Sequence, residues 1–95
     1  MTFVAEGYEV TNARRLGAVV RELRKERGWT QAKLSAEAHV SRGYLVKLEQ
    51  GHPTAELRTV MRVLEALDAG LKVTEIVESP TDRLLREEFD RIVDG

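Results

Sequence analysis

The side chains that most often perform covalent chemistry are scarce in this 95-residue chain. There is no cysteine, which excludes a disulfide framework, a thiolate zinc site and a cysteine nucleophile. The two histidines, His39 and His52, have no further metal-ligating residue at a suitable spacing. No nucleophile–base pair, phosphate-binding loop or metal cluster is visible in the sequence. We therefore predict a protein that is not an enzyme and that uses neither a metal nor another cofactor.

Charged side chains are abundant, and they are unevenly distributed along the chain. Residues 12–63 contain eleven Lys or Arg and five Asp or Glu, a net charge of +6. Residues 64–95 contain four basic and nine acidic residues, a net charge of −5. A basic body with an acidic tail indicates two kinds of surface and two kinds of partner. The alternative is that these charges only keep the protein soluble.

The basic body is predicted to contain four helices, and the spacing of the apolar residues indicates where they lie. The predicted helices span residues 12–27, 31–38, 42–50 and 55–69. The first helix carries the i, i+3, i+4, i+7 stripe of an amphipathic helix at Leu16, Val19, Val20 and Leu23. The fourth has an apolar face wider than one small domain requires, because Val63 extends its stripe.

Capping residues support these boundaries. The predicted N-caps are Asn12 or Thr11, Thr30, Ser41 and Thr54. The predicted helix ends are Gly28, Gly51 and Gly70. Because each helix thus has both a start and a stop, we predict a mainly α fold with four to five helices.

The pattern changes after Gly70 to the alternation of a short β-strand over residues 71–77. A lone strand is not stable, so this one must pair with the N-terminal segment or with a second copy of the chain. We predict a C-terminal dimerisation strand. Its apolar contacts would come from Leu71, Val73, Ile76 and Val77.

A fifth, acidic amphipathic helix is predicted over residues 80–93, with Ser79 as its cap and Pro80 at its first position. Its apolar side carries Leu85, Phe89 and Ile92, at the i, i+4, i+7 spacing of anchors for a protein groove. The alternative is that this helix packs on its own domain or on the dimer mate. The chain is thus divided into an N-terminal arm (1–11), a helical domain (12–69) and a tail (70–95) whose strand and acidic helix serve dimerisation or partner binding.

The stretch RKERGWTQAKLSAEAHVSRGYLVKLEQG, residues 24–51, resembles the DNA-binding core of the phage-repressor and Cro-like family, the xenobiotic-response-element regulators. The matching motifs are G-W-T-Q-x-x-L at the second helix, V-S before the third, and L-x-x-L-E-x-G at its end. The resemblance extends from Leu16 to about Leu67 and implies a helix-turn-helix bundle that binds double-stranded DNA.

The resemblance also implies which residues contact DNA. Base contacts are expected from Arg42, Gly43 and Lys47. Phosphate contacts are expected from Gln31, Ser41 and Tyr44. Arg42 can present a bidentate fork to guanine, and Gly43 would allow the backbone to approach DNA closely. Tyr44 could equally cover the edge of the core.

Three further positions follow from the resemblance. Arg24 and Glu49 are expected to form a structural ion pair between the first and third helices. His39 replaces the glycine that the family usually has in the turn, and it should take a positive φ at some cost. Ser35 replaces a small alanine, and the packing should tolerate the change because the two residues are close in size.

Within the family, the segment VMRVLEALDAGLKVTEI, residues 60–76, is similar to the helix-then-strand arrangement of Hip-type antitoxins. This implies a homodimer that binds an inverted-repeat operator, represses its own operon and neutralises a kinase-like toxin. Two alternatives remain: a stand-alone phage or metabolic repressor, and a protein-interaction adaptor that barely binds DNA. The basic body argues against the adaptor.

The sequence shows no sign of a membrane protein. No apolar run approaches the roughly 20 residues of a membrane span, and the N-terminal segment has two Glu and no Lys or Arg, unlike a secretory signal. We therefore expect a soluble cytoplasmic protein without a membrane partner.

Overall fold

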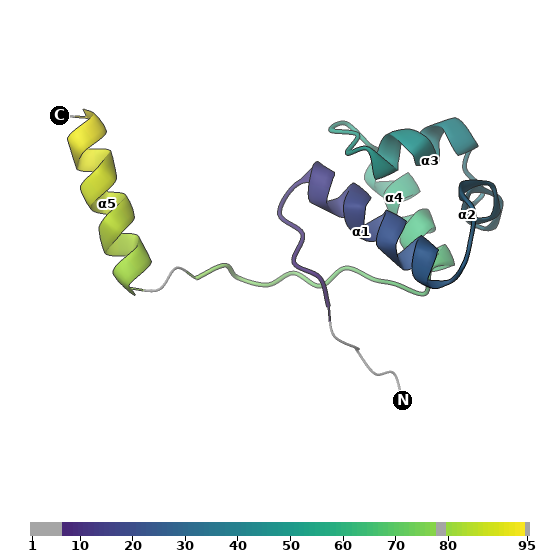
Figure 1. Cartoon of the computed structure of the whole chain (residues 1–95), viewed down its shortest axis with the longest axis horizontal. Coiled ribbons are helices and arrows are strands. Elements are labelled where there is room, and N and C mark those ends of the chain that lie inside the picture. The colour runs from purple at the N-terminus through teal and green to yellow at the C-terminus, as the bar shows by residue number, and fades with distance from the viewer. Residues whose placement is uncertain (1–6, 78–79, 95) are drawn as a thin grey trace.

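The computed structural model describes residues 7–77 and 80–94. Five α-helices lie in this part of the chain: α1 (Ala13–Glu26), α2 (Gln31–Ala38), α3 (Arg42–Glu49), α4 (Leu57–Ala66) and α5 (Pro80–Asp94). Helices α1 to α4 pack into one bundle, and an extended segment leads from it to α5 (Figure 1). The predicted mainly α fold is confirmed.

Three of the four predicted N-caps of the bundle are confirmed. The side chains of Asn12, Thr30 and Ser41 each accept a hydrogen bond from the backbone N–H three residues later, at 2.7, 3.0 and 3.0 Å. Gly28 follows α1 with a φ of 69°, the left-handed conformation predicted for it. These caps satisfy backbone groups that a helix end leaves unpaired, and they fix where α1, α2 and α3 begin.

The start of α4 differs from the prediction. The sequence predicts a helix over 55–69 capped by Thr54, but α4 begins after Glu56, which makes no side-chain capping bond. The Thr54 N–H instead donates to Nδ1 of His52 at 3.4 Å. Thr54 therefore belongs to the turn after α3, where its hydroxyl also lies 3.5 Å from Nδ1 of His52 and caps no helix.

The end of α4 also differs from the prediction. The left-handed residue is Asp68, with a φ of 53°, and not Gly70. The guanidinium of Arg27, just after α1, donates to the carbonyl of Leu67. A donor from another helix thus satisfies a carbonyl at the end of α4, so the helix can end before the glycine.

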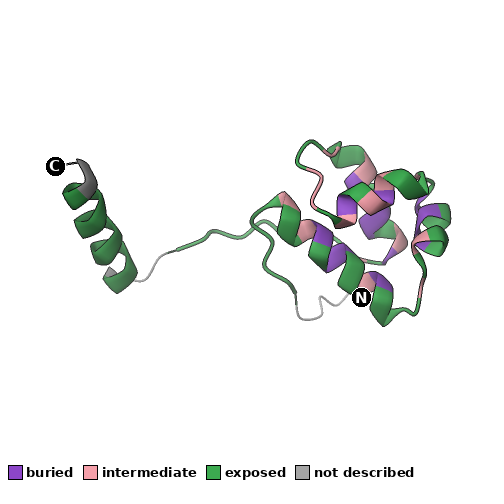
Figure 2. Ribbon diagram, turned by 45° about the horizontal axis from the view of Figure 1, so that its top comes forward, coloured by how far each residue is buried: buried purple, intermediate pink, exposed green. Residues whose placement is uncertain are grey.

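The core lies where α1, α2, α3 and α4 face one another (Figure 2). Its buried members are Val20, Leu34, Ala38, Leu45, Leu48, Val60, Val63, Leu64 and Leu67. Every helix of the bundle contributes to this set. Of the stripe predicted for α1, Val20 is in the core, and Leu16 and Leu23 pack against it partly buried. On α4 the buried face is narrower than predicted, since Leu57 and Met61 remain 65% and 40% exposed. The hydrophobic effect therefore fixes the four helices as one unit.

Gly17 brings α1 unusually close to α3. A Cβ atom at this position would lie 2.3 Å from the carbonyl oxygen of Leu48 and 2.8 Å from that of Glu49. Real Cβ atoms do not approach backbone oxygens so closely, so any larger residue would push the helices apart. The sequence analysis did not single out Gly17.

The predicted strand is absent from the described residues. Residues 71–77 are extended but make no β-ladder, and residues 7–12 do not pair with them. Leu71, Val73, Ile76 and Val77 are 53%, 98%, 78% and 78% exposed. The alternating pattern provides a strand's side chains, but a strand also needs a partner for its backbone hydrogen bonds, and the described residues of one copy offer none.

Helix α5 forms as predicted, and Ser79, its predicted cap, lies outside the described residues. Its apolar side chains do not pack on the bundle: Leu85, Phe89 and Ile92 remain 65%, 65% and 71% exposed. The expectation that α5 might pack on its own domain is therefore wrong for this chain.

Candidate nucleic-acid interface

A tight turn joins α2 to α3 and sets the angle between them. His39 ends α2 with φ 56° and ψ 44°, which confirms the positive φ predicted for it. The Val40 N–H then donates to the carbonyl of Ser35 at 3.0 Å. This closes the end of α2 just before Ser41 caps α3, so two short helices are joined with little freedom between them.

Helix α3 has one buried and one open face. Leu45 and Leu48 are 0% and 1% exposed and anchor α3 in the core. Arg42, Gly43 and Lys47 lie on the exposed side, and no described atom lies within 4 Å of where a Gly43 Cβ would be. Neither cation has an ion-pair partner among the described residues. Both side chains are thus available to a ligand that approaches α3.

Gln31 lies at the start of α2 and is held beside the end of α3. Its Nε2 donates to Oε1 of Glu49 at 3.4 Å. Gln31 lines a shallow hollow between α1, α2 and α3 together with Arg21 and Gln50. The sequence analysis did not identify Arg21 or Gln50, although Arg21 lies one helical turn before Arg24 and Gln50 directly follows Glu49.

Ser41 and Tyr44 are at the start of α3, and their hydroxyl groups lie in different surroundings. The Ser41 hydroxyl accepts the capping bond from the Tyr44 N–H and keeps its own hydrogen for another acceptor. The Tyr44 hydroxyl is buried without a hydrogen-bond partner among the described residues. Burial raises the pKa of Tyr44, and the neighbouring Thr59 hydroxyl partly offsets the rise. This placement favours the alternative in which Tyr44 covers the edge of the core.

Arg24 joins α1 to the end of α3 through a two-bond contact with Glu49. The Arg24 Nε and Nη2 atoms donate to the two carboxylate oxygens at 2.9 and 3.0 Å. Its Nη1 donates to the carbonyl of Trp29 at 2.8 Å. The two side chains are only 10% and 4% exposed. This buried pair holds α3 against α1, so its role in the structure is to orient α3.

Residues 7–77 and 80–94 form neither a metal-binding cluster nor a membrane-spanning helix. In that part of the chain, no three His, Asp or Glu residues are grouped so that they could hold a metal ion. None of the helices described there is long and apolar enough to cross a membrane.

The arrangement of α2, turn and α3 is that of a helix-turn-helix, and sequence comparison agrees. The family model described as helix-turn-helix matches residues 20–72. The chain therefore belongs to the helix-turn-helix family. It is a Cro/C1-type regulator, so DNA is the ligand for which this interface is built.

Two relatives support this assignment. The HTH-type transcriptional regulator y4mF of Sinorhizobium fredii is 38% identical over 58 residues, which is 61% of this chain and 76% of the relative. The immunity repressor protein of Bacillus phage phi105 is 37% identical over 73 residues, 77% of this chain but only 48% of the repressor. The chain thus spans about half the length of the phage protein. Both relatives bear the names of regulators and not of enzymes.

Solved structures share the fold. HipB in complex with a 20-mer of O2 aligns with a TM-score of 0.70 and 18% identity, over 76% of this chain and all of that one. HipB in a complex of HipA, HipB, O2 and O3 aligns with a TM-score of 0.69 and 17% identity, over 75% of this chain and all of that one. The clp gene regulator ClgR of C. glutamicum aligns with a TM-score of 0.59 and 32% identity, over 70% of this chain and 85% of ClgR.

Proposed function

We propose that the protein is a repressor that binds an inverted-repeat operator as a homodimer. The observation that carries this is the open face of α3, where Arg42 and Lys47 are exposed and have no ion pair in the described part of the chain. Two copies related by a two-fold axis would place two α3 helices in major grooves about 34 Å apart. Arg42 would then read a guanine edge through its two-pronged guanidinium.

The test begins with selection of duplexes from a random-sequence pool by the full-length protein. An inverted repeat should be enriched. Arg42→Ala should bind the selected duplex more weakly by about 1–3 kcal/mol and should tolerate other bases at one position of each half-site. Arg83→Ala, which removes an exposed cation from α5, is the control and should bind like the parent. If Arg42→Ala keeps both affinity and base preference, α3 does not read the operator through this residue.

The proposal includes a finer role: the protein is the antitoxin of a type II toxin–antitoxin pair, represses its own operon and neutralises a kinase-like toxin. Its support is that HipB, whose whole solved chain aligns with this one, is found in complexes with operator DNA and with HipA. The exposed apolar side of α5 offers a second surface, separate from α3. Leu85, Phe89 and Ile92 would enter a groove of the toxin at the i, i+4, i+7 spacing.

Two titrations of Phe89→Ala test this role. One uses the selected duplex, and the other uses the purified product of the reading frame adjoining this one. Affinity for that product should fall, because a buried aromatic anchor is lost, while DNA affinity stays at the parental value. If DNA affinity and stability fall together and the other affinity is unchanged, α5 belongs to the dimer interface.

A second candidate is a stand-alone repressor without a toxin partner. The phi105 immunity repressor favours it, since that relative is 37% identical over 73 residues. In this case no toxin would be encoded nearby, and α5 would pack against the dimer mate. A sedimentation experiment on Phe89→Ala separates the two candidates. Only the stand-alone repressor, in which α5 packs on the dimer mate, is expected to form a weaker dimer when Phe89 is replaced.

A further inference from the structure

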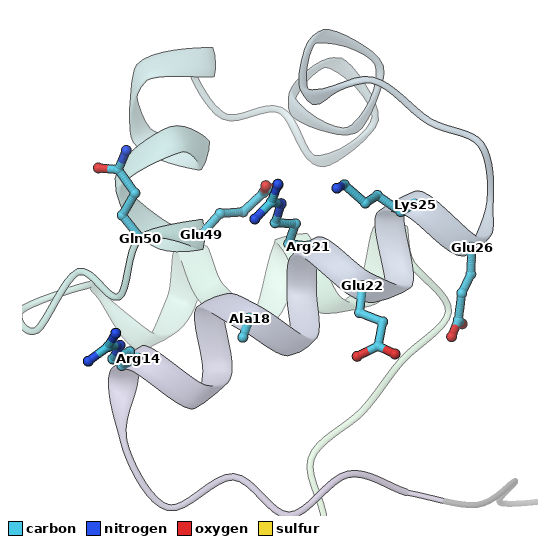
Figure 3. Close-up of a pocket in the computed structure, with 8 residues that line it drawn as sticks. All are labelled: Arg14, Ala18, Arg21, Glu22, Lys25, Glu26, Glu49 and Gln50. Carbon is cyan, nitrogen blue, oxygen red and sulfur yellow. The ribbon is translucent and has the colours of Figure 1, made fainter.

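Helix α1 carries a row of cations outside the helix-turn-helix itself. Arg14, Arg21 and Lys25 are exposed, and with Ala18 they line one face of the helix. The Arg21 and Lys25 side chains extend toward α2 and α3, whereas Glu22 points to the opposite side (Figure 3). We call Arg14, Arg21 and Lys25 the α1 basic row.

The charges of this row are not neutralised within the described chain. No ion pair or side-chain hydrogen bond joins Arg14, Arg21 or Lys25 to any described acidic group. The nearest candidate, Glu49, is 4% exposed and already binds Arg24 with both carboxylate oxygens. Glu22 and Glu26 also line the pocket beside the row, but neither forms an ion pair with the row, and both point away from α2 and α3 (Figure 3). The cations of the row therefore outweigh the acidic groups on the side of α1 that faces α2 and α3.

The row adjoins the expected DNA-binding surface at Arg21 and the turn after α3 at Arg14. Arg21 lines the same hollow as Gln31 and Gln50, between α1 and the helix-turn-helix. Arg14 lies against the turn after α3, where a Cβ on Gly51 would be 2.8 Å from the Arg14 Cα. A strand of DNA whose phosphate reaches Gln31 would therefore meet Arg21 next.

We propose that the α1 basic row is a second contact with the phosphate backbone, placed beside the groove that α3 enters. The inference rests on the proposed function and names further residues of the same interface. From Arg14 to Lys25 the row is about 16 Å long, at 1.5 Å per helical residue. One strand of duplex DNA presents about five phosphates over that axial length. Long, flexible cations with no internal partner are suited to contacts that read charge and not base sequence.

The test compares two double variants of the full-length protein with equal changes in charge. Arg21→Gln/Lys25→Gln alters the row, and Lys72→Gln/Arg83→Gln alters exposed cations of the C-terminal part. Affinity is measured at several salt concentrations for the selected operator and for a duplex of unrelated mixed sequence. Thermal unfolding of each variant confirms that the bundle is intact.

The row variant should bind both duplexes at least about tenfold more weakly, and its slope of log affinity against log salt should fall by about two per protomer. The control should retain the parental slope. A row variant with the parental slope would overturn the inference while leaving the proposed function in place. A parent protein that binds neither duplex would instead refute the proposed function. A variant that lost base preference with an unchanged slope would also overturn the inference.

Discussion

The bundle and the C-terminal segment use the same kinds of apolar residue with opposite results. In the bundle, Leu34, Leu45 and Val63 are 0% exposed. In the C-terminal segment, Val73 is 98% exposed and Phe89 is 65% exposed. The four helices of the bundle close on one another, whereas no described part of the chain covers the extended segment and the single helix α5.

This difference shows that the bundle and the C-terminal segment depend on different contacts for their structure. The bundle obtains its stability from contacts between its own helices, so it should fold without help. Residues 71–77 and 81–92 expose a run of apolar side chains, which in soluble proteins marks a surface for another molecule. The comparison predicts that changes in the bundle alter stability, and that changes in the tail alter assembly.

The sharpest test removes the tail. Truncation after Ala69 should leave the thermal unfolding of the bundle nearly unchanged, because the core residues all lie before that point. Sedimentation should show a monomer or an aggregate, and tight operator binding should be lost, because one half-site alone makes half the contacts. A truncated protein that sediments like the parent would show that the dimer is built elsewhere.

Breaking the contact between α1 and α3 should have the next largest effect. Arg24→Ala leaves the carboxylate of Glu49 buried and unpaired and should lower the free energy of unfolding by about 3–5 kcal/mol. Lys33→Ala is the matched control, since the Lys33–Glu37 pair is 52% and 46% exposed and should contribute no more than about 1 kcal/mol. Urea unfolding of both variants measures the difference. Equal losses would mean that the Arg24 contact is no more important than a surface pair.

Two glycines test how closely the helices must approach. Gly17→Ala should destabilise the bundle by about 1–3 kcal/mol, because its methyl group has no room against the carbonyl of Leu48. Gly43→Ala has open space and should gain up to about 1 kcal/mol of helix stability. The same Gly43 variant should bind operator more weakly if DNA approaches the backbone there. Chemical unfolding and a gel-shift titration separate these effects.

The smallest effect is expected at Tyr44. Tyr44→Phe removes a hydroxyl that has no partner in the described structure, so stability should stay the same or rise by up to about 1 kcal/mol. The salt dependence of DNA binding should also be unchanged. A salt slope lower by about one per protomer would instead assign the hydroxyl to a phosphate.

Much of the bundle could be predicted from the sequence because its signals are local. The N-caps at Asn12, Thr30 and Ser41 act within a single helical turn, and the positive φ of His39 follows from the resemblance to a family that has a glycine at this turn position. The exposure of Arg42 follows from a local signal, since it is one residue past a cap and three before the buried Leu45.

The features that the sequence missed depend on which groups become neighbours in the folded chain, and residue type alone does not specify this. Threonine is a common N-cap residue, but Thr54 lies in a turn with His52, whose Nδ1 accepts a hydrogen bond from the Thr54 N–H. In the sequence, Gly17 is only a residue that weakens a helix. In the structure, the carbonyl of Leu48 lies so close that no larger residue would fit. The alternation over 71–77 gives the side-chain pattern of a strand. It does not supply the second strand whose backbone would form the hydrogen bonds of a sheet.

The open face of α3 has a consequence for how this protein can diverge. Arg42, Gly43 and Lys47 lie outside the core, so replacing them leaves the residues that hold α3 in place untouched. Under the proposed function, a duplicated copy would therefore acquire a new target through two or three substitutions without first becoming unstable. For the same reason, the outward residues of α3 can be replaced by those of a relative. The altered protein would keep its fold and, under the proposed function, bind a different promoter.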